Sequence, residues 1–315
     1  MAATLQHDAA PDTAADESRP SVWLTDALLL LMALIWGVNY SVVKYGTTVL
    51  RPLAYNGVRI TAAAVVLFVV AALGRSPRVN RREALALLAL GALGNGIYQW
   101  FFIEGVARTR AGDVALVLAA APAFIALLGR AWGVERIDRR GMIGIALSIA
   151  GIGLVGYGGA TGATRGSSFV GDALALAGCL CWSVYSVLVK PYTHHVDPVR
   201  LSAWTMAGGA LPLLVVAAPS IVVTRWSAVP LLGWGALGYS AILALVVAYL
   251  FWYRGLRVLG PTRTAMYGNL QPLIALIVAW MMLAEVPTRW QIIGTVAIMV
   301  GLLLTRAAPP AGEAT

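Results

Sequence analysis

The chain has 315 residues, of which 59% are hydrophobic and 12% charged, and its mean hydropathy is +0.78. Soluble globular domains carry about 25% charged residues, so about half of the usual charge is missing. With two cysteines, this composition excludes a disordered protein, a cytosolic enzyme and a disulfide scaffold. The net charge of +9 does not indicate a nucleic-acid partner, because membrane proteins concentrate Lys and Arg in their cytoplasmic loops.

Long apolar runs without charge follow one another along the chain. A helix needs about 20 mostly apolar residues to cross a bilayer, and shorter runs reach that length when flanking Arg or Lys side chains extend to the interface. The runs do not alternate as the strands of a membrane barrel do. We therefore predict an all-α polytopic membrane protein with ten transmembrane helices. The charge-free stretches are 27–43, 60–74, 84–103, 114–129, 141–164, 173–189, 201–224, 226–253, 264–284 and 290–305.

The two ends of the chain are predicted to be short tails, a disordered one at 1–22 and another at 307–315. The flank of the first apolar run is acidic, so this run is expected to be a retained helix and not a cleaved signal peptide. With the N-terminus in the cytoplasm, 15 Lys and Arg residues fall on the cytoplasmic side and 7 outside. This excess predicts that both termini are cytoplasmic.

Comparison of the chain with itself reveals an internal repeat. A shift of 146 residues gives 11 identities over 26–52, including Trp36 with Trp182, and a shift of 150 gives ten identities over 101–154. The repeat predicts two halves, 23–164 and 165–306, with five spans each. Because five is odd, the second half is expected to be inverted in the membrane. Inverted repeats are typical of alternating-access transporters, which bind substrate at the repeat interface near the midplane.

Aromatic and amide side chains at helical spacing mark the middle of the first span and of its repeat. Trp36, Asn39 and Tyr40 share one helix face, and Trp182 and Tyr185 repeat that spacing. Trp and Tyr usually gather at the membrane interfaces, so their place in mid-membrane points either to the lining of a substrate cavity or to contacts between helices.

Further uncharged candidates lie in the third, eighth and ninth spans. Aromatic faces with a few amides suit a neutral, zwitterionic or amphipathic solute. Packing between helices is the alternative here too. The candidates are Asn95, Tyr98, Gln99, Tyr249, Tyr267, Asn269 and Gln271.

Two ionisable residues inside spans are functional candidates. Arg59 and Glu104 are both expected toward the outside, where they could form a structural ion pair; Glu104 is also the one carboxylate that could couple transport to protons. Pro122 and Pro272 lie inside the fourth and ninth spans, where each is expected to kink its helix as a packing element or as a hinge. The sequence contains no catalytic motif and no metal-binding cluster, so neither catalysis nor a cofactor is expected.

These features resemble the EamA-type proteins of the drug/metabolite transporter superfamily, over nearly all of 24–306. Within that superfamily, the chain is most similar to YddG-like amino-acid exporters. The resemblance rests on Trp36-Gly37, Asn39, Pro52 and Arg59, and on the series Gly105, Ala111, Pro122, Glu135, Gly144 and Gly151, which returns as Gly255, Pro272, Glu285, Gly294 and Gly301.

The resemblance implies a transporter in the bacterial inner membrane that exports small metabolites, most simply aromatic or neutral amino acids. A drug or cation effluxer of the same fold is the main alternative, and a membrane-embedded enzyme is a remote one. The expected partners are the lipid bilayer and a small-molecule substrate. The oligomeric state is left open, with a monomer as the simplest assumption.

Overall fold

A computed structural model describes residues 22–74, 77–132, 138–160, 166, 168–259, 264 and 267–306. Within these ranges the chain is helical and has no strand, which confirms the all-α class. The predicted tails lie outside the described residues except for Val22, and so does the repeat residue Glu135.

The helices of the N-terminal half follow the predicted spans. They are α1 (Val22–Val49), α2 (Pro52–Leu73), α3 (Arg81–Gly91), the π-helical η1 (Ala92–Ile97), α4 (Tyr98–Arg108), α5 (Ala111–Ala119), α6 (Ala121–Ala131) and α7 (Arg139–Ala160).

The remaining helices belong to the C-terminal half. They are α8 (Phe169–Val189), the short η2 (Lys190–His194), α9 (Pro198–Val222), the short η3 (Trp226–Ala228), α10 (Leu231–Gly238), the π-helical η4 (Tyr239–Val247), α11 (Ala248–Val258), α13 (Gln271–Leu283) and α14 (Arg289–Arg306).

Eight helical stretches among the described residues are long and apolar enough to cross a membrane, so the protein is a multi-pass membrane protein. The helix α13 is apolar but has 13 residues, and α14 is not among the eight. The predicted count of ten spans and the inversion of the second half therefore stay predictions.

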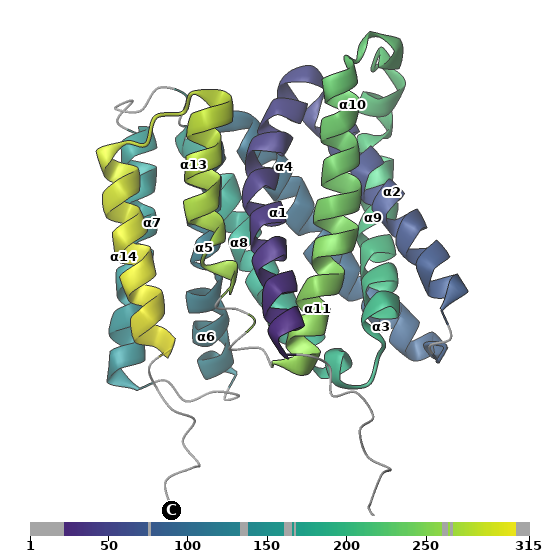
Figure 1. The fold of residues 1–315 in the computed structure, drawn as a ribbon, viewed down its shortest axis with the longest axis horizontal. Helices are drawn as coiled ribbons and strands as arrows, with labels where there is room; N and C mark the ends of the chain where they lie inside the picture. Colours follow the sequence, from purple (N-terminus) through teal and green to yellow (C-terminus); the bar gives the residue numbers. More distant parts are fainter. Residues whose placement is uncertain are drawn as a thin grey trace, which may run out of the picture.

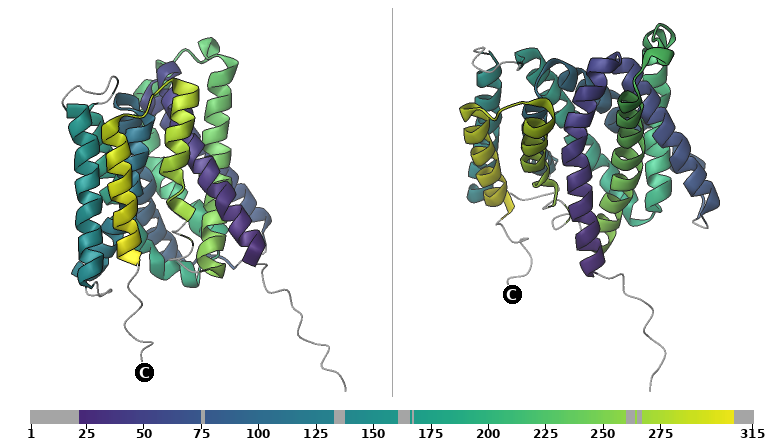
Figure 2. Two further views of the ribbon diagram at one scale, coloured as in Figure 1. Left: turned by 60° about the vertical axis from the view of Figure 1, so that its left-hand side comes forward. Right: turned by 45° about the horizontal axis from the view of Figure 1, so that its top comes forward.

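The helices form one bundle in which the first and second halves of the chain are interleaved (Figure 1). The closest pairs include α7 with α14, α2 with α9, α4 with α8 and α1 with α13. The start of α1 and the end of α14 lie at the same end of the bundle, the lower end in Figure 1, and Figure 2 agrees from two further sides. We refer to the opposite end of the bundle as the far end.

Glycines allow α9 and α3 to approach each other closely. A Cβ atom on Gly208 would lie 2.1 Å from the carbonyl oxygen of Leu88, and one on Gly91 would lie 2.0 Å from the carbonyl oxygen of Thr205. A side chain at either position would collide with backbone. Small residues of this kind permit the close helix contacts that drive packing in membranes.

Two π-helical segments lie in the interior of long helices. The segment η1 joins α3 to α4, and η4 joins α10 to α11. A π-helix contains more residues per turn than an α-helix and leaves main-chain groups open to other partners, which is one reason why such segments are frequent at functional sites. Both segments lie directly beside the candidate site.

Candidate substrate-binding site

Five aromatic rings from four helices meet in the interior of the bundle. The ring of Trp36 on α1 lies 5.5 Å from that of Tyr249 on α11, and the ring of Trp182 on α8 lies 6.3 Å from the same tyrosine. Trp182 also lies 5.2 Å from Tyr98 and 5.4 Å from Tyr185. These five residues are called the aromatic centre below. Sequence reasoning selected all five, and the structure brings them into contact across both halves of the chain.

The aromatic centre is packed and partly hydrogen-bonded. Tyr185 and Tyr249 are buried, and Trp36 and Trp182 are partly buried against the surrounding apolar residues. The Trp36 indole N–H donates to the carbonyl of Ala244 in η4, over 2.8 Å. The two surface pockets described by the structure do not include any of these residues. The contacts fit helix packing in this conformation, so cavity lining stays a prediction.

Arg59 lies beside this centre and is completely buried on α2. Its guanidinium donates to Asn56 Oδ1 over 2.8 Å, to Ser240 Oγ over 2.8 Å and to Gln99 Oε1 over 2.5 Å. Ser240 in turn donates to Asn39 Oδ1 over 2.7 Å. The predicted residues Asn39 and Gln99 therefore belong to one polar cluster around Arg59.

The expected ion pair between Arg59 and Glu104 does not form. Glu104 instead pairs with Arg108, one turn further along α4, whereas the acceptors of Arg59 are uncharged. The physical reason is helix geometry: residues four apart on a helix are neighbours. The prediction placed both residues toward the outside, but Arg59 donates to Ser240 of η4, which in turn donates to Asn39 in the middle of α1.

Asn95 contacts the aromatic centre from η1. It is fully buried in η1, and its Oδ1 accepts a hydrogen bond of 3.4 Å from the hydroxyl of Tyr249. Its Nδ2 has no hydrogen-bond partner among the described residues. A buried amide donor without a partner is costly, which marks this side chain as a candidate for ligand contact.

The remaining ring candidate, Tyr40, is buried near Arg59. Its ring lies 5.9 Å from that of Phe102, which lies 6.0 Å from Tyr98. The Arg59 guanidinium carbon lies 5.5 Å from the Phe102 ring centre, within the range of a cation–π contact. Phe102 therefore lies between Arg59 and the aromatic centre, and Tyr40 packs against this phenylalanine.

The three predicted residues before Pro272 lie apart from the polar cluster, where α13 begins beside α1. The hydroxyl of Tyr267 donates to Asp26 Oδ1 over 2.7 Å, close to the start of α1. Asn269 is buried and Gln271 partly buried. Tyr267 still packs near Trp36, in the apolar cluster that includes Leu29. These residues thus border the site on the side of the termini.

The two prolines begin helices instead of bending continuous ones. Pro122 lies in the first turn of α6, after α5 has ended and Ala120 has taken a non-helical conformation. Pro272 lies in the first turn of α13. The first turn tolerates proline because its N–H groups have no partner within the helix. The predicted kinks are therefore helix breaks, and their role as hinges is untested.

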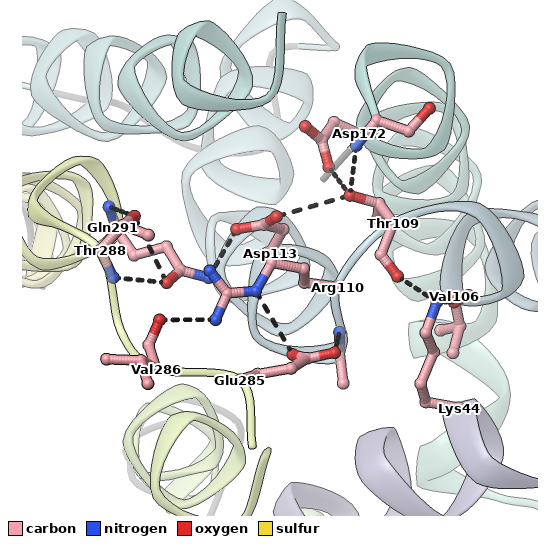
Figure 3. Close-up of polar contacts among 12 residues, drawn as sticks. Lys44, Val106, Thr109, Arg110, Asp113, Asp172, Glu285, Val286, Thr288 and Gln291 are labelled. Carbon is pink, nitrogen blue, oxygen red and sulfur yellow. Dashed lines mark hydrogen bonds and ion pairs between the residues drawn. The ribbon is translucent and has the colours of Figure 1, made fainter. Parts of the chain in front are cut away.

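A second buried polar cluster lies at the far end of the bundle, and its contacts are drawn in Figure 3. It connects the segment between α4 and α5 with α8 and with the loop from α13 to α14. The sequence analysis did not select these residues as site candidates. They form what we call the far-end network: Thr109, Arg110, Asp113, Asp172, Glu285 and Gln291.

The far-end network joins the two halves of the chain by short contacts. Gln291 Nε2 donates to Asp113 Oδ1 over 2.7 Å, and Thr109 Oγ1 donates to Asp172 Oδ1 over 2.7 Å. Arg110 Nη2 donates to the Val286 carbonyl over 2.7 Å, and its Nε lies 3.7 Å from Glu285 Oε2. Burial raises the pKa of the Glu285 carboxyl above its usual value, although the main-chain N–H of Ala111 and the charge of Arg110 oppose this shift.

Lys44 stabilises the same end of the bundle by a different contact. Its ammonium donates to the main-chain carbonyls of Val106, Ala107 and Thr109, over 2.9, 3.2 and 2.7 Å. These carbonyls lie at the C-terminal end of α4, where the helix dipole favours a cation. The lysine therefore satisfies carbonyl groups that the helix itself leaves open.

Sequence reasoning missed Asn56 and Ser240 in the polar cluster and the whole far-end network, including Asp113. Asn56 lies three positions before Arg59 on the same helix face, so its spacing could have revealed it. Ser240 is a small residue in an apolar run, and nothing in its neighbourhood marks it. Asp113 lies in the first turn of α5, one residue before the charge-free stretch 114–129, so it fell outside the predicted span.

Long apolar helices around a buried aromatic and polar interior define a multi-pass membrane protein of the transporter class. Residues 23–157 and 169–307 each match the EamA-like transporter family. The chain belongs to this family.

Relatives of the chain carry transporter names. It is 25% identical over 279 residues to an uncharacterized transporter, YyaM, of Bacillus subtilis, with 88% of this chain and 91% of the relative covered. It is 26% identical over 281 residues to a protein of Streptantibioticus cattleyicolor named "Probable terminal-alkyne amino-acid exporter", with 88% and 91% covered. It is 27% identical over 282 residues to the uncharacterized inner membrane transporter YedA of Escherichia coli, with 87% and 89% covered.

The fold is also found among solved structures. A protein of 19% sequence identity superposes with a TM-score of 0.62 over 90% of this chain and 96% of the other. At this identity the likeness concerns the arrangement of helices and carries no information on substrate.

Proposed function

We propose that the protein is an alternating-access transporter that exports small amphipathic metabolites, above all aromatic or neutral amino acids, from the cytoplasm. The observation that carries this proposal is the buried aromatic centre beside the Arg59 cluster, assembled from helices of both halves. Rings offer a surface for an apolar side chain, and the amides and hydroxyls offer partners for its polar groups.

The proposal includes ten spans in two inverted halves of five. The family match occurs twice, once in each half of the chain. The contacts are also paired as a two-fold axis requires: α2 packs with α9, and α7 packs with α14. In the proposed repeat α8 corresponds to α1, and α6 corresponds to α13. The contact between α1 and α13 accordingly has its counterpart in the contact between α8 and α6. An inverted repeat places the substrate site between the halves.

The proposed orientation says which contacts must open during export. The excess of Lys and Arg on the side of the termini favours cytoplasmic termini. The far end of the bundle would then face the outside, and the far-end network would close the path there. Export would need the contacts from Gln291 to Asp113 and from Arg110 to the α13–α14 loop to break while those on the cytoplasmic side form.

The name of one relative supports the substrate class, since that protein of Streptantibioticus cattleyicolor is named as an amino-acid exporter. An inner-membrane location is proposed because another relative is named as an inner membrane transporter. We propose the lipid bilayer and the substrate as the partners of the protein, and a monomer as the working unit.

Flux measurements in proteoliposomes test the proposal. Labelled phenylalanine, leucine and glutamine are loaded inside, and their exit is followed with and without a proton gradient. We expect saturable transport of at least one of them. Transport of ethidium or another lipophilic cation, without transport of any amino acid, would establish the drug effluxer instead.

Alanine substitutions test the role of the aromatic centre. Replacement of Trp36 or Trp182 in a well-folded variant is expected to raise KM or abolish flux. Unchanged transport would assign these rings to helix packing.

A further inference from the structure

Arg59 is a buried cation that pairs with no carboxylate of the described residues. Its relative exposure is 0%, and none of the ion pairs among the described residues includes it. Its three described acceptors, on Asn56, Gln99 and Ser240, are uncharged. Transfer of a charge from water to a membrane interior is unfavourable unless an opposite charge compensates it. The cluster thus solvates the guanidinium but leaves its charge unbalanced.

The guanidinium also retains hydrogen-bonding capacity. Nε, Nη1 and Nη2 each donate one described bond. Each terminal nitrogen of arginine carries two hydrogens, so one N–H on Nη1 and one on Nη2 have no described acceptor. A carboxylate can accept two parallel bonds from such a fork, a geometry that is both strong and specific.

The surroundings of Arg59 fit the rest of an amphipathic molecule. Rings in succession lead from the guanidinium to the aromatic centre, through Phe102 at 5.5 Å and then Tyr98, which lies 6.0 Å from Phe102. Along the same helical stretch, four positions before Gln99, Asn95 holds its unpartnered Nδ2. The site therefore offers a cation at one side, apolar ring faces at the other and a free amide donor.

We infer that Arg59 binds the carboxylate of the transported solute and thereby selects carboxylates over amines and neutral compounds. The inference rests on the proposed function and specifies the substrate chemistry of the same site. An anionic group that enters the cluster compensates the buried charge, whereas an amine or a lipophilic cation adds a second positive charge to it. In this structure Gln99 Oε1 accepts a hydrogen bond from Arg59 Nη2, and its amide must turn aside when the solute arrives.

Binding measurements on the purified protein in detergent test this assignment separately from flux. Calorimetry compares 3-phenylpropionate with 3-phenylpropionamide, and L-phenylalanine with L-phenylalaninamide, so that each pair differs in the carboxylate alone. We expect both carboxylates to bind at least about tenfold more tightly than their amides. Equal affinities within the pairs, or no binding of either carboxylate, would overturn the inference.

Two variants test whether the preference for carboxylates over amides depends on Arg59. In Arg59→Gln the two affinities of each pair are expected to become equal, whereas the exposed Arg225→Gln, which removes the same charge elsewhere, keeps the preference. Persistence of the preference in Arg59→Gln would refute the assignment.

A second substitution covers the case in which Arg59→Gln does not fold. Gln99→Glu supplies an internal carboxylate at the position of an existing acceptor, so it is expected to compete with the ligand and remove the preference without loss of stability. If Arg59 were a structural residue alone, Gln99→Glu would leave the preference unchanged. A carboxylate preference without amino-acid flux would refute the proposed export function but not the site.

Discussion

The indole N–H of Trp36 donates to the main-chain carbonyl of Ala244 over 2.8 Å, although 208 positions separate the two residues. The bond connects the middle of α1 with the π-helical segment η4. It also explains how a tryptophan is accommodated deep in the bundle, because its one polar group has a partner. The two halves of the chain are thus joined at their centre by a hydrogen bond as well as by ring contacts.

Loss of this bond should be measurable. Trp36→Phe keeps an aromatic ring but leaves the Ala244 carbonyl without its donor, so we expect a loss of about 1–3 kcal/mol in the free energy of unfolding. Trp182→Phe is the matched control, because no hydrogen bond of the Trp182 indole is described within the chain. Denaturation in detergent compares the two variants; equal losses would mean that the bond contributes nothing beyond ring volume.

Opening of the far end should depend on the contact between Gln291 and Asp113. Gln291→Ala removes the 2.7 Å bond to Asp113 Oδ1, and a loss of about 1.4 kcal/mol in the closed state raises the open population about tenfold. A cysteine in place of the buried Val114 reports opening through its reaction with a membrane-impermeant thiol reagent, in a chain whose Cys181 is replaced by serine.

The control for this experiment is Thr288→Ala. It removes the side-chain cap of α14 but keeps the bond between Gln291 and Asp113. Its labelling rate should stay near that of the parent chain. A similar increase in both variants would show that fraying of α14, and not the bond between the halves, governs access to Val114.

Glu285 should make stability depend on pH. Burial raises the pKa of its carboxyl in the folded protein above the ordinary value of 4.5. A raised folded-state pKa means that the folded protein binds the proton more tightly than the unfolded chain. The stabilisation is then fully present below pH 4.5 and is lost as the pH rises through the folded-state pKa.

The measurement compares the parent chain with Glu285→Gln, which cannot titrate at this position. The unfolding midpoint of the parent chain, relative to that of the variant, should rise when the pH falls from about 7 to about 5. A difference that is constant over this range, or that falls with acidification, would contradict the prediction.

Because α9 packs closely against α3, a side chain at Gly208 should destabilise the protein. In Gly208→Ala the added Cβ would lie 2.1 Å from the Leu88 carbonyl oxygen, so we expect a loss of about 1–3 kcal/mol in stability or a failure to fold. Gly235→Ala is the control, because a Cβ there meets nothing within 4 Å and alanine favours the helix. Thermal unfolding should show opposite shifts for the two variants.

Much of the helical arrangement could be predicted from the sequence, because apolar runs and their breaks are local properties. The aromatic centre could also be predicted, since Trp36 and Trp182 occupy equivalent places in the repeat and the structure brings both to Tyr249. Contacts between distant segments could not be predicted in the same way. Arg59 was paired with Glu104 from depth alone, whereas its true partners depend on the rotation of α4 and η4 about their axes.

The helix break before Pro122 and the π-helical segments could not be predicted for a similar reason. Pro122 signals an interruption, but whether a helix bends or stops depends on the turn that Ala120 adopts. The π-helical segments carry no sequence signature. The far-end network was missed because Asp113 and Glu285 lie one residue outside the charge-free stretches 114–129 and 264–284, and burial of such flanking charges depends on the other segments that cover them.

The segment η1 sets the direction in which the side chains of α4, the helix that follows it, point. Each residue of an α-helix turns the chain by about 100°, so a chain shortened by one residue between Ala92 and Ile97 would present α4 rotated by about that angle. Gln99 would then point away from Arg59 although neither side chain had changed. Deletion of a single residue in η1 should therefore damage the site more than many substitutions in η1. The number of residues in this segment constrains the sequence as much as their identity does.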